Sequence, residues 1–126
     1  MESNVRERRI LVVDDEPIIS HICTKTLTAE GYKVDVAVNG LVAKNMVSEK
    51  EYDLCLVDVR TPEMNGMEFY HCLEQEHPEL CSKVIFATGD VLSGNVSTFL
   101  KNTGVRYMAK PFTPSELKTT VREALE

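Results

Sequence analysis

Five short apolar runs, separated by segments of helical periodicity, constrain the fold of this chain more than any other feature. The runs occupy residues 10–13, 33–38, 54–57, 83–87 and 105–109. Apolar residues recur every three or four positions in the segments 17–30, 40–47, 66–76, 93–102 and 114–125. Strands that alternate with helices in this way are typical of a parallel sheet covered on both faces. The pattern therefore predicts an α/β fold of five strands and five helices.

Composition limits the kinds of partner that such a fold can have. The chain has 126 residues, 43% of them hydrophobic and 27% charged, which is typical of one globular domain. Its net charge of -6 disfavours direct binding to nucleic acid, because backbone phosphates would meet a negative field. No apolar run approaches the ~20 residues that cross a bilayer, and no signal peptide opens the chain. We expect neither nucleic acid nor a membrane as a direct partner.

The cysteines carry no sign of a metal site or of a disulfide framework. The four residues form no C-x-x-C pair and mostly lie within apolar patterns: Cys23, Cys55, Cys72 and Cys81. We interpret them as reduced core residues of a cytoplasmic protein.

The third apolar run ends on Asp58, and a loop with turn signals follows it. Thr61-Pro62 disfavours helix before the proline, and Asn65-Gly66 is typical of a turn. A carboxylate at the carboxyl end of a central parallel strand lies where open α/β sheets bind their ligands. An aspartate at a strand end can also simply cap the next turn. Asp58 alone leaves both interpretations open.

Further polar groups follow the other strands. Asp14 and Asp15 come after the first run, Thr88 after the fourth and Lys110 after the fifth. A parallel sheet brings these positions to one edge. Crowded carboxylates repel unless a divalent cation joins them, and oxygen ligands without His or Cys favour Mg²⁺. With a lysine and a threonine beside them, they predict a site where a carboxylate attacks phosphorus. The alternative is a set of caps and surface salt bridges.

Four motifs resemble the receiver domain of two-component response regulators in combination. They are V-V-D-D-E-P, L-V-D-V-R-T-P-E-M-N-G, A-T-G-D and Y-M-A-K-P-F. The resemblance extends from Arg9 to Leu125. It implies a CheY-like, flavodoxin-like doubly wound (βα)5 sandwich with strand order 2-1-3-4-5. On this basis a polar segment, 1–8, precedes the receiver domain, 9–126.

The resemblance also implies the chemistry of the site. Asp58 would accept a phosphoryl group from the phosphohistidine of a sensor histidine kinase or a histidine phosphotransfer domain. Asp14, Asp15, Asp58 and the backbone carbonyl of Arg60 would hold Mg²⁺. Such a domain catalyses only its own phosphorylation and dephosphorylation, so we expect no enzyme with turnover.

Thr88 and Lys110 would contact the phosphoryl oxygens, and the Lys110–Pro111 bond would be cis. Thr88 and Tyr107 match the switch residues of the family, which implies a response on the surface formed by 93–102, 105–109 and 114–125. That surface would regulate a downstream protein or a covalently linked domain, and it could also form a weak homodimer.

Two further positions bear on the lifetime of the phosphorylated state. Arg60 and Asp90 follow the expected phosphoacceptor and the expected threonine by two residues, where receivers place groups that flank the hydrolytic water. Thr61 departs from the family, which usually has methionine before the loop proline. We expect this change to alter packing rather than chemistry.

Other classes fit the sequence less well. A dinucleotide site needs a glycine-rich turn after the first strand, where this chain has acids. An aspartate-nucleophile phosphatase of the haloacid dehalogenase type would have D-x-D there, and the chain reads Asp14-Asp15. A degenerate receiver used only for binding would lack some of the residues that act in phosphoryl transfer, and this chain has all five: Asp14, Asp15, Asp58, Thr88 and Lys110. The last two motifs resemble receivers of hybrid sensor kinases more than those of transcription factors. Whether the domain stands alone or belongs to a longer protein stays open.

Overall fold

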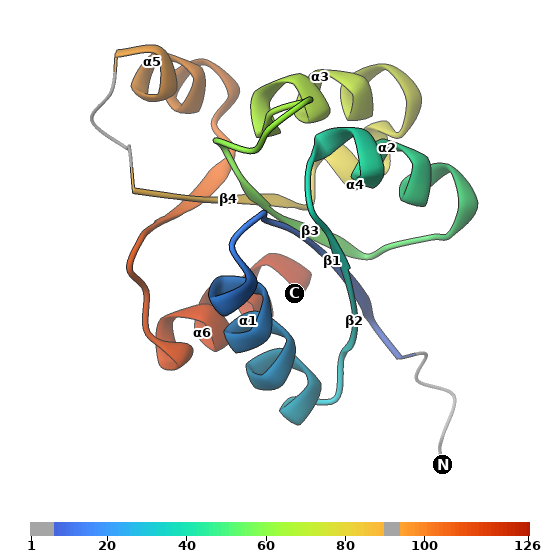
Figure 1. Cartoon of the computed structure of the whole chain (residues 1–126), viewed down its shortest axis with the longest axis vertical. Coiled ribbons are helices and arrows are strands. Elements are labelled where there is room, and N and C mark those ends of the chain that lie inside the picture. The colour runs from blue at the N-terminus through green and yellow to red at the C-terminus, as the bar shows by residue number, and fades with distance from the viewer. Residues whose placement is uncertain (1–6, 90–93) are drawn as a thin grey trace.

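A computed structural model describes residues 7–89 and 94–126, and within these ranges it contains five strands and six helices (Figure 1). The strands are β1 (Arg9–Val13), β2 (Lys33–Ala37), β3 (Leu54–Asp58), β4 (Val84–Thr88) and β5 (Arg106–Ala109). The helices are α1 (Pro17–Ala29), α2 (Gly40–Glu49), α3 (Gly66–Glu76), α4 (Pro78–Cys81), α5 (Gly94–Thr103) and α6 (Pro114–Leu125). Among the described residues, none of the helices has the length and apolar character needed to span a bilayer.

The five strands form one parallel sheet in the order β2-β1-β3-β4-β5, which confirms the expected doubly wound topology. The register pairs Val13 of β1 with Val57 of β3, so that the residues that follow these two strands lie at the same edge. Thr88, the last residue of β4, pairs with Ala109 of β5. The carboxyl ends of four strands therefore meet at one edge of the sheet.

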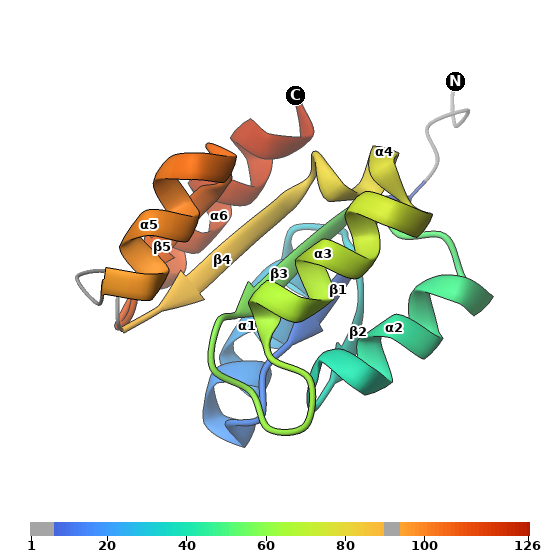
Figure 2. The same cartoon turned by 90° about the horizontal axis from the view of Figure 1, so that it is seen from above.

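Helices cover both faces of the sheet (Figure 2). On one face, α1 and α6 pack against Ile10 and Val12 of β1 and Leu54 and Leu56 of β3. On the other face, α2, α3, α4 and α5 pack against the residues of the same strands that point the opposite way. All five residues of β3 and of β4 are buried, which explains why these runs are apolar throughout instead of alternating.

Polar side chains fix the beginnings of three helices. Asn39 accepts a hydrogen bond from the backbone nitrogen of Val42 at the start of α2. Asn65 and Glu68 form a capping box at the start of α3. Thr113 and Glu116 form a second capping box at the start of α6.

Most element boundaries lie within two residues of those expected from the sequence, and one helix was not expected. The unexpected element is the four-residue helix α4, which begins at Pro78, two residues after the end of α3. Proline favours the first helical position because its missing N–H has no partner there in any helix. Gly31 follows α1 at a φ of 96°, a backbone conformation that favours glycine at the end of a helix. Ser93, the expected start of the fourth helix, lies outside the described residues.

Candidate functional site

The carboxyl edge of the sheet gathers the side chains that the strand ends predict. Asp14 directly follows β1, Asp58 ends β3, Thr88 ends β4, and Lys110 directly follows β5. The backbone nitrogen of Lys110 donates a hydrogen bond to the carbonyl oxygen of Thr88 at 2.9 Å, which fixes the end of β5 against β4. Asp14, Asp58 and Thr88 are buried, so the site lies within the edge of the sheet rather than above it.

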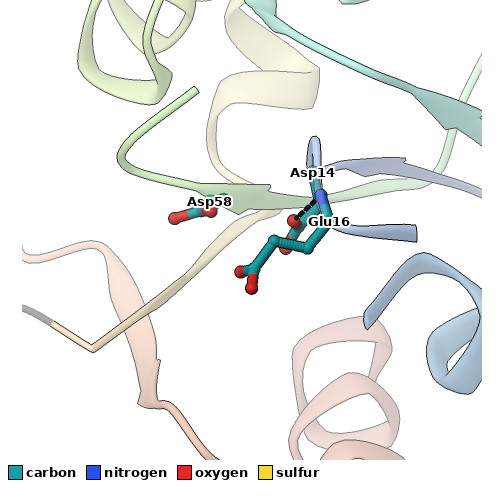
Figure 3. Close-up of side chains that lie close together, drawn as sticks. All are labelled: Asp14, Glu16 and Asp58. Carbon is teal, nitrogen blue, oxygen red and sulfur yellow. Dashed lines mark hydrogen bonds between the residues drawn. The ribbon is translucent and has the colours of Figure 1, made fainter. Parts of the chain in front are cut away.

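The ammonium group of Lys110 lies among three carboxylates. Its Nζ is 2.9 Å from Oδ2 of Asp14, 3.1 Å from Oδ2 of Asp58 and 3.0 Å from Oε1 of Glu16. The side chains of Asp14 and Asp58 are 4% and 9% exposed, whereas that of Glu16 is 59% exposed. Figure 3 shows the three carboxylates on their elements. The ion pairs of Lys110 with Asp14 and with Asp58 are buried. In each of these pairs, the charge of one group is balanced by the charge of the other.

Burial and charge shift the acid–base properties of the site in opposite directions. Burial raises the pKa of Asp58 above its usual value, although the hydrogen bond from the Arg60 backbone and the charge of Lys110 oppose that shift. Burial alone would lower the pKa of Lys110, but its hydrogen bonds to Asp14 and Glu16 outweigh burial and raise it. Lys110 is therefore a permanent cation at neutral pH.

The loop after β3 is held close to Asp58 by two glycines. A Cβ at Gly66 would lie 2.5 Å from the carbonyl oxygen of Asp58, and one at Gly40 would lie 2.5 Å from that of Met64. Both approaches are too short for any residue with a side chain. The Gly66 nitrogen donates to Val59, and the Gly40 nitrogen donates to Met64. These contacts anchor the loop from both sides of the 59–65 segment.

Side-chain oxygens and backbone groups within this loop complete its hydrogen bonding. Oδ1 of Asp58 accepts a hydrogen bond from the backbone nitrogen of Arg60 at 3.1 Å. The hydroxyl of Thr61, which stands where the family usually has methionine, donates to the carbonyl oxygen of Met64 at 2.9 Å. A methionine side chain has no donor and could not form this hydrogen bond within the loop.

Asp15 and Glu16 occupy places that the sequence alone did not distinguish. Asp14, Glu16 and Asp58 each offer a carboxylate oxygen, and these oxygens lie within 4.8 Å of one another. Asp15 is not part of that group; it is exposed and lines a cavity of about 480 Å³ together with Arg60. Glu16 was missed as a site residue, although it belongs to the acidic run before Pro17. Neighbouring side chains along a chain point in different directions. The order of the acids in the sequence therefore could not show which of them faces Lys110.

The donor set fits a small divalent cation. Three carboxylates and one ammonium leave two negative charges in a space where the carboxylate oxygens lie within 4.8 Å of one another. Oxygen ligands in this number are those that Mg²⁺ prefers, with water completing its coordination. The Lys110 ammonium partly neutralises the same carboxylates in this structure.

Of the expected switch and gate residues, the structure describes Thr88, Tyr107 and Arg60. Thr88 is 1% exposed, whereas Tyr107 on β5 is 53% exposed and pairs with Phe86 of β4. The Lys110–Pro111 peptide bond is cis. Arg60 is exposed at the mouth of the loop. Asp90, its expected partner, lies outside the described residues.

Sequence and structure comparisons agree with this geometry. Residues 10–122 match the response regulator receiver domain family. The transcriptional regulatory protein ZraR of Klebsiella oxytoca is 37% identical over 118 residues, which cover 92% of this chain and 26% of that protein. A CheY-like response regulator receiver domain protein from Methanospirillum hungatei has a TM-score of 0.86 and 30% identity, covering 95% of this chain and 94% of the other.

A second solved structure is the receiver domain of a sensor histidine kinase from Pseudomonas aeruginosa, in which a magnesium ion is coordinated in the active site cleft. It has a TM-score of 0.84 and 25% identity, and the match covers 95% of this chain and 98% of the other. A parallel sheet that places acids and a lysine at its carboxyl edge has the groups that a phosphate-handling domain needs. The chain belongs to the response regulator receiver domain family and is a phosphoacceptor switch of two-component signalling.

Proposed function

We propose that Asp58 is the phosphoacceptor and takes its phosphoryl group from a phosphohistidine on a sensor histidine kinase or a histidine phosphotransfer domain. The observation that supports this most directly is the place of its carboxylate, buried at the end of β3 and 3.1 Å from the Lys110 ammonium. A carboxylate oxygen of Asp58 attacks phosphorus, the bond from phosphorus to the imidazole nitrogen breaks, and the imidazole leaves. Lys110 stabilises the negative charge on the phosphoryl oxygens during the transfer.

The reaction requires Mg²⁺ in this proposal, and the acid cluster supports that requirement. Asp14 and Asp58 would hold the ion, with Asp15 and the backbone carbonyl of Arg60 as further ligands. When bound, the ion neutralises phosphoryl oxygens as they approach the carboxylates. Asp14 contributes a buried negative charge that gives the site its affinity for a cation.

Thr88 and Tyr107 transmit the effect of phosphorylation from the site to the surface of the domain. We expect the hydroxyl of Thr88 to move toward the phosphoryl group, which opens space for the exposed ring of Tyr107 to turn inward. The surface formed by α5, β5 and α6 then changes and regulates a downstream protein or a linked domain. The same surface offers a contact for a weak homodimer. Arg60 and Asp90 would limit the access of water and so set the lifetime of the phosphorylated state.

The wider protein context is also a proposal. The chain spans 26% of the length of ZraR and 50% of that of the DNA-binding response regulator MtrA of Mycolicibacterium smegmatis, another curated relative. We propose a cytoplasmic receiver without enzymatic turnover on a separate substrate. The likeness to a sensor-kinase receiver supports a place within a hybrid histidine kinase.

Labelling with a small phosphodonor tests the assignment. Acetyl phosphate with Mg²⁺ should add one phosphoryl group to the protein, and Asp58→Asn should abolish the addition, because an amide nitrogen is no nucleophile of this kind. Intact-protein mass spectrometry measures the added mass. Asp35→Asn, which changes a carboxylate in the middle of β2, is the matched control and should label as the parent does.

Three outcomes would contradict the proposal. Labelling of Asp58→Asn would place the phosphoryl group on another residue. Labelling that persists in the presence of a metal chelator would show that the reaction does not require Mg²⁺. Sustained release of inorganic phosphate from a phosphate monoester, with no lasting label on the protein, would instead identify a phosphatase with an aspartate nucleophile.

A further inference from the structure

Glu16 makes a contact that its position in the helix does not require. It occupies the N-cap of α1, where a short polar side chain usually accepts a hydrogen bond from the first turn. Its side chain makes no such bond and contacts Lys110 instead, with Oε1 at 3.0 Å from Nζ. The backbone of Glu16 is nevertheless fixed, since its nitrogen donates to Oδ1 of Asp14 at 2.9 Å (Figure 3). Its carbonyl oxygen accepts a hydrogen bond from the backbone nitrogen of Ser20. The fixed backbone of Glu16 therefore holds its carboxylate beside Lys110.

The Lys110 ammonium has three hydrogens to donate, and it has three carboxylate partners. While a phosphodonor approaches and before its bond to Asp58 forms, all three carboxylates still hold the ammonium, and Asp58 must stay in place as the proposed nucleophile. A phosphoryl oxygen can then receive a hydrogen bond from Lys110 only if Asp14 or Glu16 gives way. Asp14 is 4% exposed, and releasing it would leave a buried carboxylate without its cation. Glu16 is 59% exposed, and its carboxylate can return to water. Glu16 is therefore the partner whose release costs least.

We propose that Glu16 is a positioning residue that holds the Lys110 ammonium in the unphosphorylated domain and competes with the phosphoryl group for it. The inference rests on the proposed role of Asp58. Glu16 slows phosphorylation in two ways: it occupies a donor of Lys110, and its negative charge opposes the approach of an anionic phosphodonor. Removing this charge should therefore speed the transfer, whereas removal of a residue that only supports the fold should not.

The rate of phosphorylation by acetyl phosphate is the first measurement. In this reaction the phosphorus–oxygen bond to acetate breaks, a phosphorus–oxygen bond to Asp58 forms, and acetate leaves. At saturating Mg²⁺, Glu16→Gln should raise the second-order rate constant about twofold to fivefold, the range that one partly exposed ion pair can supply. Glu63→Gln is the matched control, because it removes an equal charge from an exposed position of the 59–65 loop at the same edge; it should react at the parent rate.

The second measurement follows Lys110 itself and needs no phosphodonor. The ¹⁵Nζ resonance of Lys110 in the unphosphorylated protein reports how fast its hydrogens exchange with water. Exchange should be faster in Glu16→Gln than in the parent and unchanged in Glu63→Gln. Titration of each variant with Mg²⁺ alone separates this role from metal binding. If Glu16 acts by positioning Lys110, the Mg²⁺ dissociation constant should rise less than about threefold, as expected for the loss of one screened charge.

A parent-like rate together with parent-like exchange of Lys110 would overturn the role of Glu16. A large loss of Mg²⁺ affinity in Glu16→Gln without faster transfer would overturn it too, because Glu16 would then be a metal ligand. Failure of the proposed function is a separate result, since it would be seen as labelling of Asp58→Asn whatever residue stands at position 16.

Discussion

Strands β3 and β5 end at the same edge of the sheet, but they are held very differently. All five residues of β3 are buried, whereas Met108 is the one buried residue of the four in β5. The loop after β3 is anchored through Gly40 and Gly66, and the start of β3 is fixed by paired hydrogen bonds between Arg9 and Asp53. The side of the site that carries Asp58, the proposed nucleophile, is thus preorganised, which is what transfer chemistry requires.

The β5 side offers what a switch requires. Tyr107 is half exposed on an edge strand, and the neighbouring helix α5 buries Val96 and Leu100 in the core. Phe99 attaches α5 to the rest of the domain through ring contacts with Tyr70 and Phe86, at centroid distances of 5.4 and 5.3 Å. An element with few buried side chains has a low cost of rearrangement. This difference is consistent with the proposal that the β3 side carries out the phosphoryl transfer and that the β5 side responds to it.

The largest effect that we expect concerns the anchored side. Gly66→Ala places a Cβ 2.5 Å from the carbonyl oxygen of Asp58 and 2.9 Å from a methyl group of Val57. Because the first contact is backbone, relief requires the loop to move, and we expect a loss of about 3 kcal/mol in the free energy of unfolding. Urea denaturation measures this loss.

Gly94→Ala is the matched control on the other side of the site. A Cβ there meets no atom within 4 Å, so α5 should tolerate it with a change of at most about 0.5 kcal/mol. Equal losses in the two variants would contradict the difference in anchoring between the β3 loop and α5.

A smaller effect is expected when a phosphoryl analogue binds. Beryllofluoride with Mg²⁺ should shift the population of the β5 side, with a coupling free energy on the order of 1–2 kcal/mol. Amide chemical shifts measured by NMR should therefore change most among described residues 94–110 and at Thr88, and little in α2 and at the start of β3. Asp58→Asn is the control and should show no such change. Shifts confined to the site residues would show that no switch connects Asp58 to Tyr107.

The sequence predicted the sheet, its order and the edge that carries the site because these features follow from patterns that repeat along the chain. Apolar runs fix the strands, and parallel strands bring Asp58 and Lys110 to one edge whatever the details. The choice between Asp15 and Glu16 at Lys110 depended on side-chain direction at the start of α1, which no spacing rule supplies. The anchoring by Gly40 depends on a contact with Met64 across two loops, and neighbouring residues in the sequence carry no signal of it.

The smallest effect concerns the hydrogen bonds that fix the amino end of β3. The hydroxyl of Tyr52 donates to Oδ2 of Asp35 at 2.7 Å, and Lys50 lies 3.3 Å from the same oxygen. Burial alone would raise the pKa of Asp35, but the hydrogen bonds from Tyr52 and Lys50 and the nearby cations outweigh it and lower the pKa. A carboxyl whose pKa is lowered by folding stabilises the fold fully above its unfolded pKa. That contribution disappears as the pH falls through the folded pKa.

Asp35→Asn should therefore cost about 0.5–1 kcal/mol at neutral pH, as expected for a partly exposed charged group with one good hydrogen bond. The difference from the parent should shrink below the usual pKa of an aspartate, near 4, and vanish in stronger acid. Urea denaturation at several pH values measures it. Tyr52→Phe is the matched variant: it removes the donor and keeps the charge, so its own cost should fall when Asp35 is already Asn. A cost of Asp35→Asn that stays constant from neutral pH into acid would show that the carboxylate charge does not help to hold the start of β3.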